Sequence, residues 1–136
     1  MADPSDPIAD DEILFRRVPV SQGWYSLETG ILLPEAFQPH AKNDTTGLSV
    51  ARKKYKTAKE AAKGRPGKSY FVVKLRAGDL RRLGIAVEPR PLDNDPGHAE
   101  LPDLNSGNRK TTSTIERQHV LAKNHLGVEG PFVTDA

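Results

Sequence analysis

The stretch 69-SYFVVKLRAGDLRRLGIAVEPRPL-92 decides the fold that this sequence predicts. Residues 70–73 are aromatic or β-branched, which are the types that fit a pleated, half-buried surface. From Phe71 on, Phe71, Val73 and Leu75 share one face and Val72, Lys74 and Arg76 the other, so one face of this segment is expected to be buried. The pattern therefore predicts a strand at the centre of a sheet that has a covered face.

A short helical turn and a second strand are expected to follow this strand. Asp79 is the residue type that caps a helix N-terminus, and Gly84 suits the left-handed position that ends a helix. Residues 85–87 then begin the second strand. Because Pro89 and Pro91 lack a donor for the sheet ladder, this strand is expected to lie at an edge or to end there.

Three further short strands are predicted outside this stretch. They cover residues 13–18, residues 48–51 and the segment that starts at His98. In the first of these, one of two adjacent arginines must point toward the packed side. The expected fold is α+β, with a small, mostly antiparallel sheet of four or five short strands, two or three short helices and long loops.

Two capping boxes indicate where the helices begin. Thr57 and Glu60 have the spacing at which hydroxyl and carboxylate each accept a bond from an otherwise free backbone N–H. Ser113 and Glu116 repeat this spacing and would open a helix that ends near Gly127. Apolar side chains at Ile115, Ala122 and Leu126 predict the buried face of that last helix.

Length and composition predict a single domain in a protein that is not secreted. The chain has 136 residues, with eleven prolines and eleven glycines that indicate many loops. It has no cysteine, which excludes disulfides and fits a cytoplasmic protein, and no apolar run approaches the ~20 residues that span a membrane. We expect a disordered acidic tail over residues 1–11, a domain over residues 12–127 and a loose C-terminal tail over residues 128–136. No cofactor and no metal site is predicted.

The positive charge is concentrated in one block. The net charge is +2, but residues 50–70 hold eight basic side chains against the single acidic Glu60. Such a block is typical of a surface that contacts nucleic acid phosphates or a larger protein partner, and also of a solvated helix face. The candidate binding residues are Arg52, Lys53, Lys54, Lys56, Lys59, Lys63, Arg65 and Lys68.

A second candidate site lies in the polar segment after the central stretch. Asp93, Asp95, His98 and Glu100 bring three carboxylates and an imidazole within eight positions. If His98 and Glu100 lie on one strand they share a face, and an imidazole beside a carboxylate can serve as a general base. The alternative is a polar turn in which Asp and Asn side chains bind backbone groups. His98 and Glu100 are therefore the candidate catalytic residues.

Two resemblances add expectations. Residues 12–101, with the steps LFRRV, LSVAR and PLDNDPGHA, resemble a family of short uncharacterised bacterial proteins, which implies no activity. Arg16 or Arg17, Ser49 and Glu100 occur in the order in which ADP-ribosyltransferase-like domains carry a cofactor-binding arginine, a serine and a catalytic glutamate. The serine of this chain does not lie in an S-T-S step, and a Q/E-x-E pair is absent.

These patterns favour an accessory or interaction protein and leave an enzyme open. The favoured function is contact with a larger protein or nucleic acid through the basic block, for example within a bacterial defence or toxin–antitoxin locus. The alternative is a small enzyme, either a ribonuclease-like toxin that uses His98 and Glu100 or an ADP-ribosyltransferase-like protein. An enzyme predicts a cleft at His98, whereas an interaction protein predicts a flat basic or apolar surface.

Overall fold

The computed structural model, which describes residues 5–135, contains one antiparallel sheet of six strands. The strands are β1 Ile13–Pro19, β2 Leu48–Arg52, β3 Ser69–Arg76, β4 Glu88–Pro89, β5 His98–Leu101 and β6 Gly127–Val133. The helices are α1 Ala58–Ala61, α2 Ala77–Arg82 and α3 Thr112–Lys123, with the short 3-10 turns η1 Val20–Gln22 and η2 Pro34–Phe37. The fold is α+β, as predicted, and its sheet has one strand more than the larger number expected.

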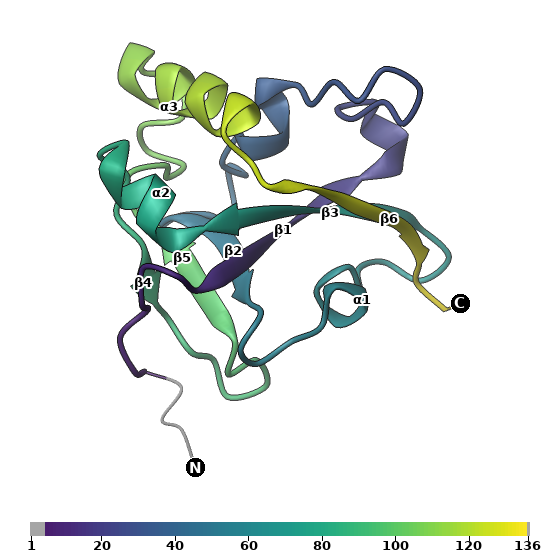
Figure 1. Ribbon diagram of the computed structural model, residues 1–136, viewed down its shortest axis with the longest axis horizontal. Helices are drawn as coiled ribbons and strands as arrows, with labels where there is room; N and C mark the ends of the chain where they lie inside the picture. Colours follow the sequence, from purple (N-terminus) through teal and green to yellow (C-terminus); the bar gives the residue numbers. More distant parts are fainter. Residues whose placement is uncertain (1–4, 136) are drawn as a thin grey trace.

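The sheet consists of two halves that are joined by a short ladder. Its strand order is β4-β5-β2-β1-β3-β6, and β1 pairs with β3 along its whole length. The described part of β1 pairs with β2 only at Leu14–Arg52 and Phe15–Ala51. Figure 1 shows the result, since β5 and β2 run steeply while β1, β3 and β6 cross them toward the right of the view. Side chains, rather than ladder bonds, can therefore fill the junction beyond these two pairs.

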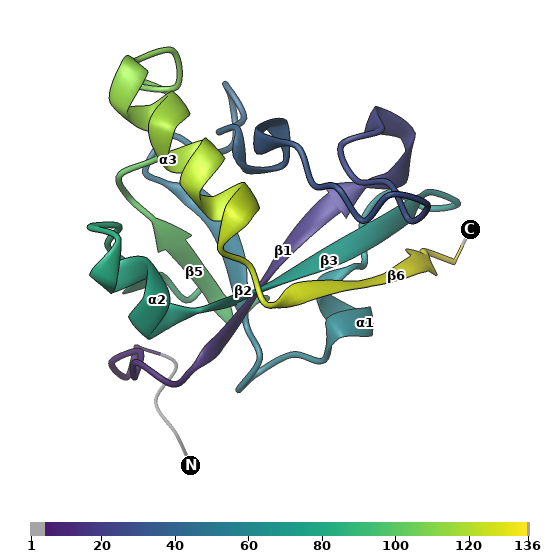
Figure 2. The same ribbon diagram turned by 45° about the horizontal axis from the view of Figure 1, so that its top comes forward.

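Each face of the sheet has its own apolar cluster. One face carries Leu14, Val18, Val73 and Leu75, which belong to the main core. The other carries a smaller cluster of Phe15, Ala62, Tyr70 and Val72. Figures 1 and 2 show α2 and α3 on the side of the main core and α1 on the opposite side. No described helix is long and apolar enough to cross a membrane.

The described part of the N-terminal segment, from residue 5 on, is packed, which corrects the predicted disorder of residues 5–11. Residues 1–4 lie outside the described part of the chain. Ile8 is only 4% exposed and joins the main core, and the carbonyl oxygen of Asp10 accepts a bond from Gly78 N at 2.7 Å. The carboxylate of Asp6 lies in ion pairs with Arg52 and Lys54. A single apolar anchor and a buried positive partner thus order an acidic segment that composition alone predicts as free.

The C-terminal segment corrects the predicted loose tail over residues 128–136. Gly127–Val133 is the edge strand β6, which pairs with β3 through Val128–Val73 and Phe132–Tyr70. Beyond it, the Thr134 hydroxyl accepts a hydrogen bond from Gly64 N at 3.0 Å. The last residue, 136, lies outside the described part. This strand forms because β3 offers an unpaired edge, and its own glycines and proline hide the strand pattern.

Two predictions around α2 need correction. Arg76 is the N-cap residue of α2, and Asp79 lies inside the first turn, where its carboxylate pairs with Arg76 and Arg82. Residues 85–87 form no strand, although Ile85 and Val87 are buried. The next residues form the two-residue strand β4, which lies at the edge of the sheet as the prolines predicted.

The last helix buries a different face from the one its apolar pattern predicts. Thr111, not Ser113, caps α3 and accepts a bond from Thr114 N. Ile115 is 43% exposed and Leu126 is 47% exposed. The helix instead buries the set Thr114, Gln118 and Leu121 against the main core. Because this buried face is mostly polar, hydrophobic periodicity could not identify it.

Candidate functional site

Strand pairing brings a serine, a histidine and a glutamate onto one face of the sheet. Ser49 of β2 lies opposite Glu100 of β5, and Ala51 lies opposite His98. Because side chains alternate along a strand, Ser49, His98 and Glu100 point to the same side. This is the side that α1 covers farther along the sheet. The prediction that His98 and Glu100 lie on a strand and share a face is confirmed.

Hydrogen bonds on both ring nitrogens fix the His98 imidazole. Nδ1 lies 2.9 Å from the backbone carbonyl oxygen of Arg90, so Nδ1 carries a hydrogen and donates it. Nε2 lies 3.2 Å from Ser49 Oγ and 3.9 Å from a carboxylate oxygen of Glu100. In the neutral ring Nε2 is an acceptor that faces the Ser49 hydroxyl, whose single hydrogen can go to Nε2 or to Asp44 Oδ1 but not to both.

Glu100 is held by a hydroxyl and lies close to a cation. Its Oε1 accepts a hydrogen bond of 2.6 Å from Thr46 Oγ1 and lies 3.8 Å from Arg90 Nε. The Glu100 side chain is 11% exposed and that of His98 is 14% exposed. Both groups therefore reach the surface while most of each side chain is fixed by neighbours. A carboxylate in such a place can stabilise positive charge that develops on a bound molecule.

A buried carboxylate and an arginine complete the cluster behind Ser49. Asp44 is 3% exposed, and its Oδ1 accepts bonds from the backbone N–H and the hydroxyl of Ser49. Arg16 of β1 donates from Nη1 to the Ser49 carbonyl oxygen at 3.0 Å and from Nε to Ala36 O at 3.1 Å. Burial lowers the pKa of Arg16, and the negative charge of Asp44 opposes this shift. Arg16 thus bridges β1 and β2 beyond the end of their short ladder.

The acidic turn before His98 does not gather around it. Leu92 and Asp95 close a tight turn by exchanging backbone hydrogen bonds. The carboxylate of Asp95 pairs with Lys56 Nζ at 2.8 Å. Among residues 5–135 no group of three or more acidic, histidine or cysteine side chains is arranged to hold a metal ion. The sequence left open whether this segment is a polar turn or a site. The structure shows a turn before His98, and from His98 onward the segment belongs to the cluster with Ser49.

Much of the predicted basic surface is neutralised by acids of the same chain. Arg52 is completely buried and pairs with Glu12 at 2.6 Å and with Asp6 at 3.1 Å. Lys54 also pairs with Asp6, and Lys56 with Asp95. Hydrogen bonds from Lys54, Tyr55 and Arg52 hold the pKa of Asp6 well below its ordinary value of 3.8, so its carboxylate stays ionised. Arg52 is thus a structural residue rather than a surface contact.

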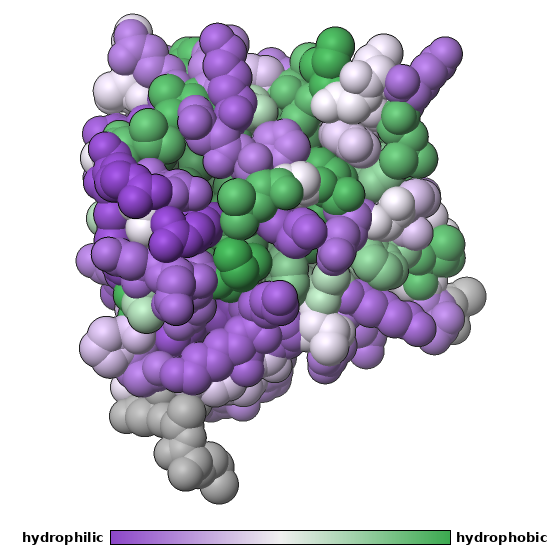
Figure 3. Space-filling model, viewed as in Figure 1, coloured by the Kyte–Doolittle hydropathy of each residue, from purple (hydrophilic) through white to green (hydrophobic). Residues whose placement is uncertain are grey.

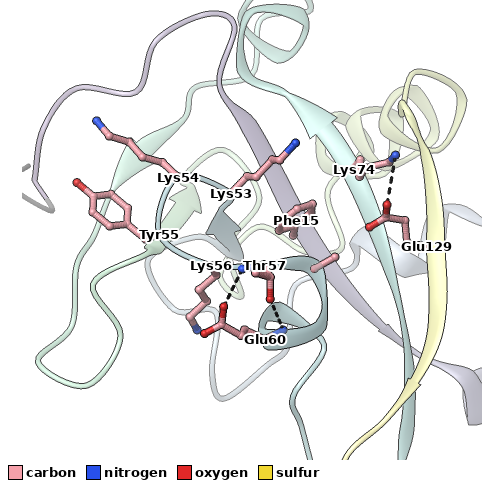
Figure 4. Close-up of a pocket in the computed structure, with 10 residues that line it drawn as sticks. Phe15, Lys53, Lys54, Tyr55, Lys56, Thr57, Glu60, Lys74 and Glu129 are labelled. Carbon is pink, nitrogen blue, oxygen red and sulfur yellow. Dashed lines mark hydrogen bonds and ion pairs between the residues drawn. The ribbon is translucent and has the colours of Figure 1, made fainter.

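The other basic residues remain on the surface. They are exposed and form no ion pair with any residue in the described part of the chain: Lys53, Lys59, Lys63, Arg65 and Lys68. Lys53 lines a cavity of about 470 Å³ together with Phe15, Lys74 and Glu129. Figure 4 shows Lys53 and Lys74 on either side of Phe15, and the capping box of Thr57 and Glu60 below them. The hollow is rich in lysine but also contains two carboxylates.

The structure adds residues that the sequence did not single out. Asp44 and Thr46 come from a loop with no recognisable motif, and Asp6 comes from the predicted tail. Neither the lysine-lined cavity nor a second cavity of about 240 Å³ beside α3 is lined by His98 or Glu100, so neither is the cleft at His98 that an enzyme predicts. Comparisons with known protein families, with curated proteins and with solved structures find no match to this chain.

Proposed function

We propose that the protein is a small enzyme of the ADP-ribosyltransferase class, which cleaves NAD and transfers its ADP-ribose group. One observation carries this proposal. Ser49 and Glu100, which are far apart in the sequence, lie opposite each other on β2 and β5, and Arg16 of the next strand, β1, binds the Ser49 carbonyl oxygen. ADP-ribosyltransferase-like domains carry their arginine, serine and glutamate in this same chain order. The likeness is one of arrangement, so the chemistry must be argued from the residues.

The residues present suit the cleavage of a glycosidic bond. When the bond between nicotinamide and ribose breaks, positive charge develops on the ribose, and the Glu100 carboxylate is placed to stabilise it. Ser49 and His98 lie 3.2 Å apart beside this carboxylate, and His98 Nε2 is 3.9 Å from it, so both border the place where a substrate hydroxyl would meet Glu100. Arg16 keeps β1 and β2 together at the junction, because it donates to the backbone carbonyl oxygens of Ser49 and Ala36 from the main-core side of the sheet.

Release of nicotinamide from NAD tests the proposal. The wild-type protein is expected to release nicotinamide, measured by chromatography, at a rate above that of buffer alone. Glu100→Gln keeps the shape and the hydrogen bond from Thr46 but removes the negative charge. Loss of one aligned electrostatic contact costs on the order of 10²–10³ in rate, so this variant is expected to fall by that factor.

A matched variant separates the site from general damage to the protein. Glu116→Gln removes the same charge from an exposed position on α3, and it is expected to leave the rate unchanged. Thermal unfolding of both variants must show a folded protein. Wild-type protein that leaves NAD intact, or equal rates for Glu100→Gln and wild type, contradicts the proposed enzyme.

A second function is binding without catalysis through the basic block. The observation in its favour is the group of five exposed and unpaired cations together with the lysine-lined cavity. Such a surface binds nucleic acid phosphates or an acidic protein in a salt-dependent way. Because Arg52, Lys54 and Lys56 are already paired, only part of the predicted block is available. Binding at ~50 mM salt, where phosphate contacts are strong, without any nicotinamide release would favour this function.

A further inference from the structure

The basic surface lies on the same side of the sheet as the Ser49, His98 and Glu100 cluster. Ser49 and Ala51 point to that side, and the β2 backbone continues to Lys53, whose N–H bonds to Ile13 O at 3.0 Å. Lys53 lies in the turn after β2 and lines one cavity with Phe15, which belongs to the apolar cluster on the Ala51 side. Within β2, Ser49 and Arg52 are about 10 Å apart at ~3.3 Å per residue. A polymer bound at Lys53 needs only a few repeating units to reach Glu100.

The remaining cations extend this surface over α1 and the loop that follows it. Lys59 lies on α1, while Lys63, Arg65 and Lys68 lie between α1 and β3. All four are exposed and form no ion pair with described residues. Figure 1 places α1 on the side of the sheet away from α2 and α3. In Figure 3, hydrophilic side chains dominate the lower edge of the view, where Figure 1 places the β2–α1 connection.

Most acids near this surface already have partners. The Glu60 carboxylate accepts a hydrogen bond from the Thr57 backbone N–H and so caps α1. This bond and the contact with the Thr57 side chain lower the pKa of Glu60. Glu129 lies 3.7 Å from Lys74, and Asp6 and Asp95 are held by the lysines beside Lys53. Asp135, next to the loop that holds Lys68, is exposed and forms no ion pair with described residues, but the five cations outnumber it. The net unpaired charge on this side is thus positive, which selects a polyanion. Regularly spaced phosphates match cations that are spread along a chain segment better than a compact acidic patch does.

We propose that the group receiving ADP-ribose is on a nucleic acid strand, which this α1-side surface holds through Lys53, Lys59, Lys63, Arg65 and Lys68. This inference rests on the proposed function. In the transfer, the bond between nicotinamide and the ribose carbon breaks, and its electron pair leaves with nicotinamide. A nucleophilic oxygen or nitrogen of the nucleic acid forms the new bond to that carbon and gives its proton to solvent. Phosphate contacts position the strand, and Glu100 acts on the ribose.

The test follows radiolabelled ADP-ribose from NAD into a single-stranded oligonucleotide and into added bacterial protein, while nicotinamide release is measured in the same samples. The measured quantity is the ratio of oligonucleotide label to nicotinamide released. For the wild type we expect label on the oligonucleotide and a ratio that falls as salt rises. The triple variant Lys53→Glu, Lys63→Glu, Arg65→Glu is expected to lower this ratio at least tenfold. The matched control Lys42→Glu, Lys110→Glu, Lys123→Glu changes exposed lysines elsewhere and is expected to retain it.

The outcomes separate this inference from the function on which it rests. No nicotinamide release by the wild type overturns the proposed function and the acceptor with it. Nicotinamide release without label on the oligonucleotide, or with label on protein instead, overturns the acceptor alone. An unchanged ratio in the first triple variant also overturns it, provided circular dichroism shows that variant to be folded.

Discussion

At the scale of single residues, Arg52 shows how a cation that looks like a surface contact becomes part of the core. Its neighbours Lys53 and Lys54 are exposed, yet its own guanidinium is completely buried between Asp6 and Glu12. Hydrogen bonds from Arg52 to Glu12 raise the pKa of Arg52, and its burial opposes that shift. Removal of one partner from such a pair leaves charge without compensation, which is strongly destabilising.

Arg52→Met is expected to lower the free energy of unfolding by about 3 kcal/mol, the lower end for a broken buried pair, because Asp6 and Glu12 still reach some water. Urea unfolding measures this change. Lys53→Met is the control at the adjacent exposed position, and it is expected to stay within about 0.5 kcal/mol of the wild type. Equal, small effects of the two changes would contradict the structural role of Arg52.

At the scale of elements, the sequence predicts those strands and helix caps that depend only on residues close together in the chain. The alternation in β3 and the capping box of Thr57 and Glu60 need only neighbours along the chain, and both are present in the structure. The strand β6 and the packed segment before β1 depend on distant partners, namely the edge of β3 and Arg52. Their own residues carry no strong signal, so both were predicted as loose tails.

The same limit applied to the candidate site. The sequence alone indicates that His98 and Glu100 share a face, because they lie two positions apart on one strand. The order of Arg16, Ser49 and Glu100 was visible in the sequence, but their meeting depends on which strands become neighbours. Asp44 and Thr46 could not be singled out, because their role comes from the register of β2 against β5.

The start of α3 offers a direct test of cap assignment. Thr111→Ala is expected to lower the free energy of unfolding by about 1 kcal/mol, because the Thr111 hydroxyl accepts from Thr114 N. Ser113→Ala, at the position that the sequence pattern favours as the cap, is expected to change it by less than about 0.5 kcal/mol. Thermal or urea unfolding distinguishes them, and a larger loss for Ser113→Ala would reverse the assignment.

At the scale of the whole molecule, the β1–β2 ladder is short, and polar side chains occupy the junction between the two halves of the sheet. Two three-stranded halves, β4-β5-β2 and β1-β3-β6, meet at two residue pairs, and Arg16 spans the junction beyond them. The apolar core occupies the opposite face under α2 and α3, so the cluster around Ser49 does not compete with it. We propose that NAD binds at this junction.

The most direct test is the backbone amide spectrum of ¹⁵N-labelled Glu100→Gln protein titrated with NAD up to about 1 mM, the upper end of common Michaelis constants. This variant is expected to bind NAD without consuming it during the measurement. If NAD binds at the β1–β2 junction, the largest shifts are expected at the amides of Thr46, Ser49 and His98, and no shift is expected for Thr114 and Gln118 on α3. Shifts that cluster on α3, or no shift at any amide, would contradict a nucleotide site at the β1–β2 junction.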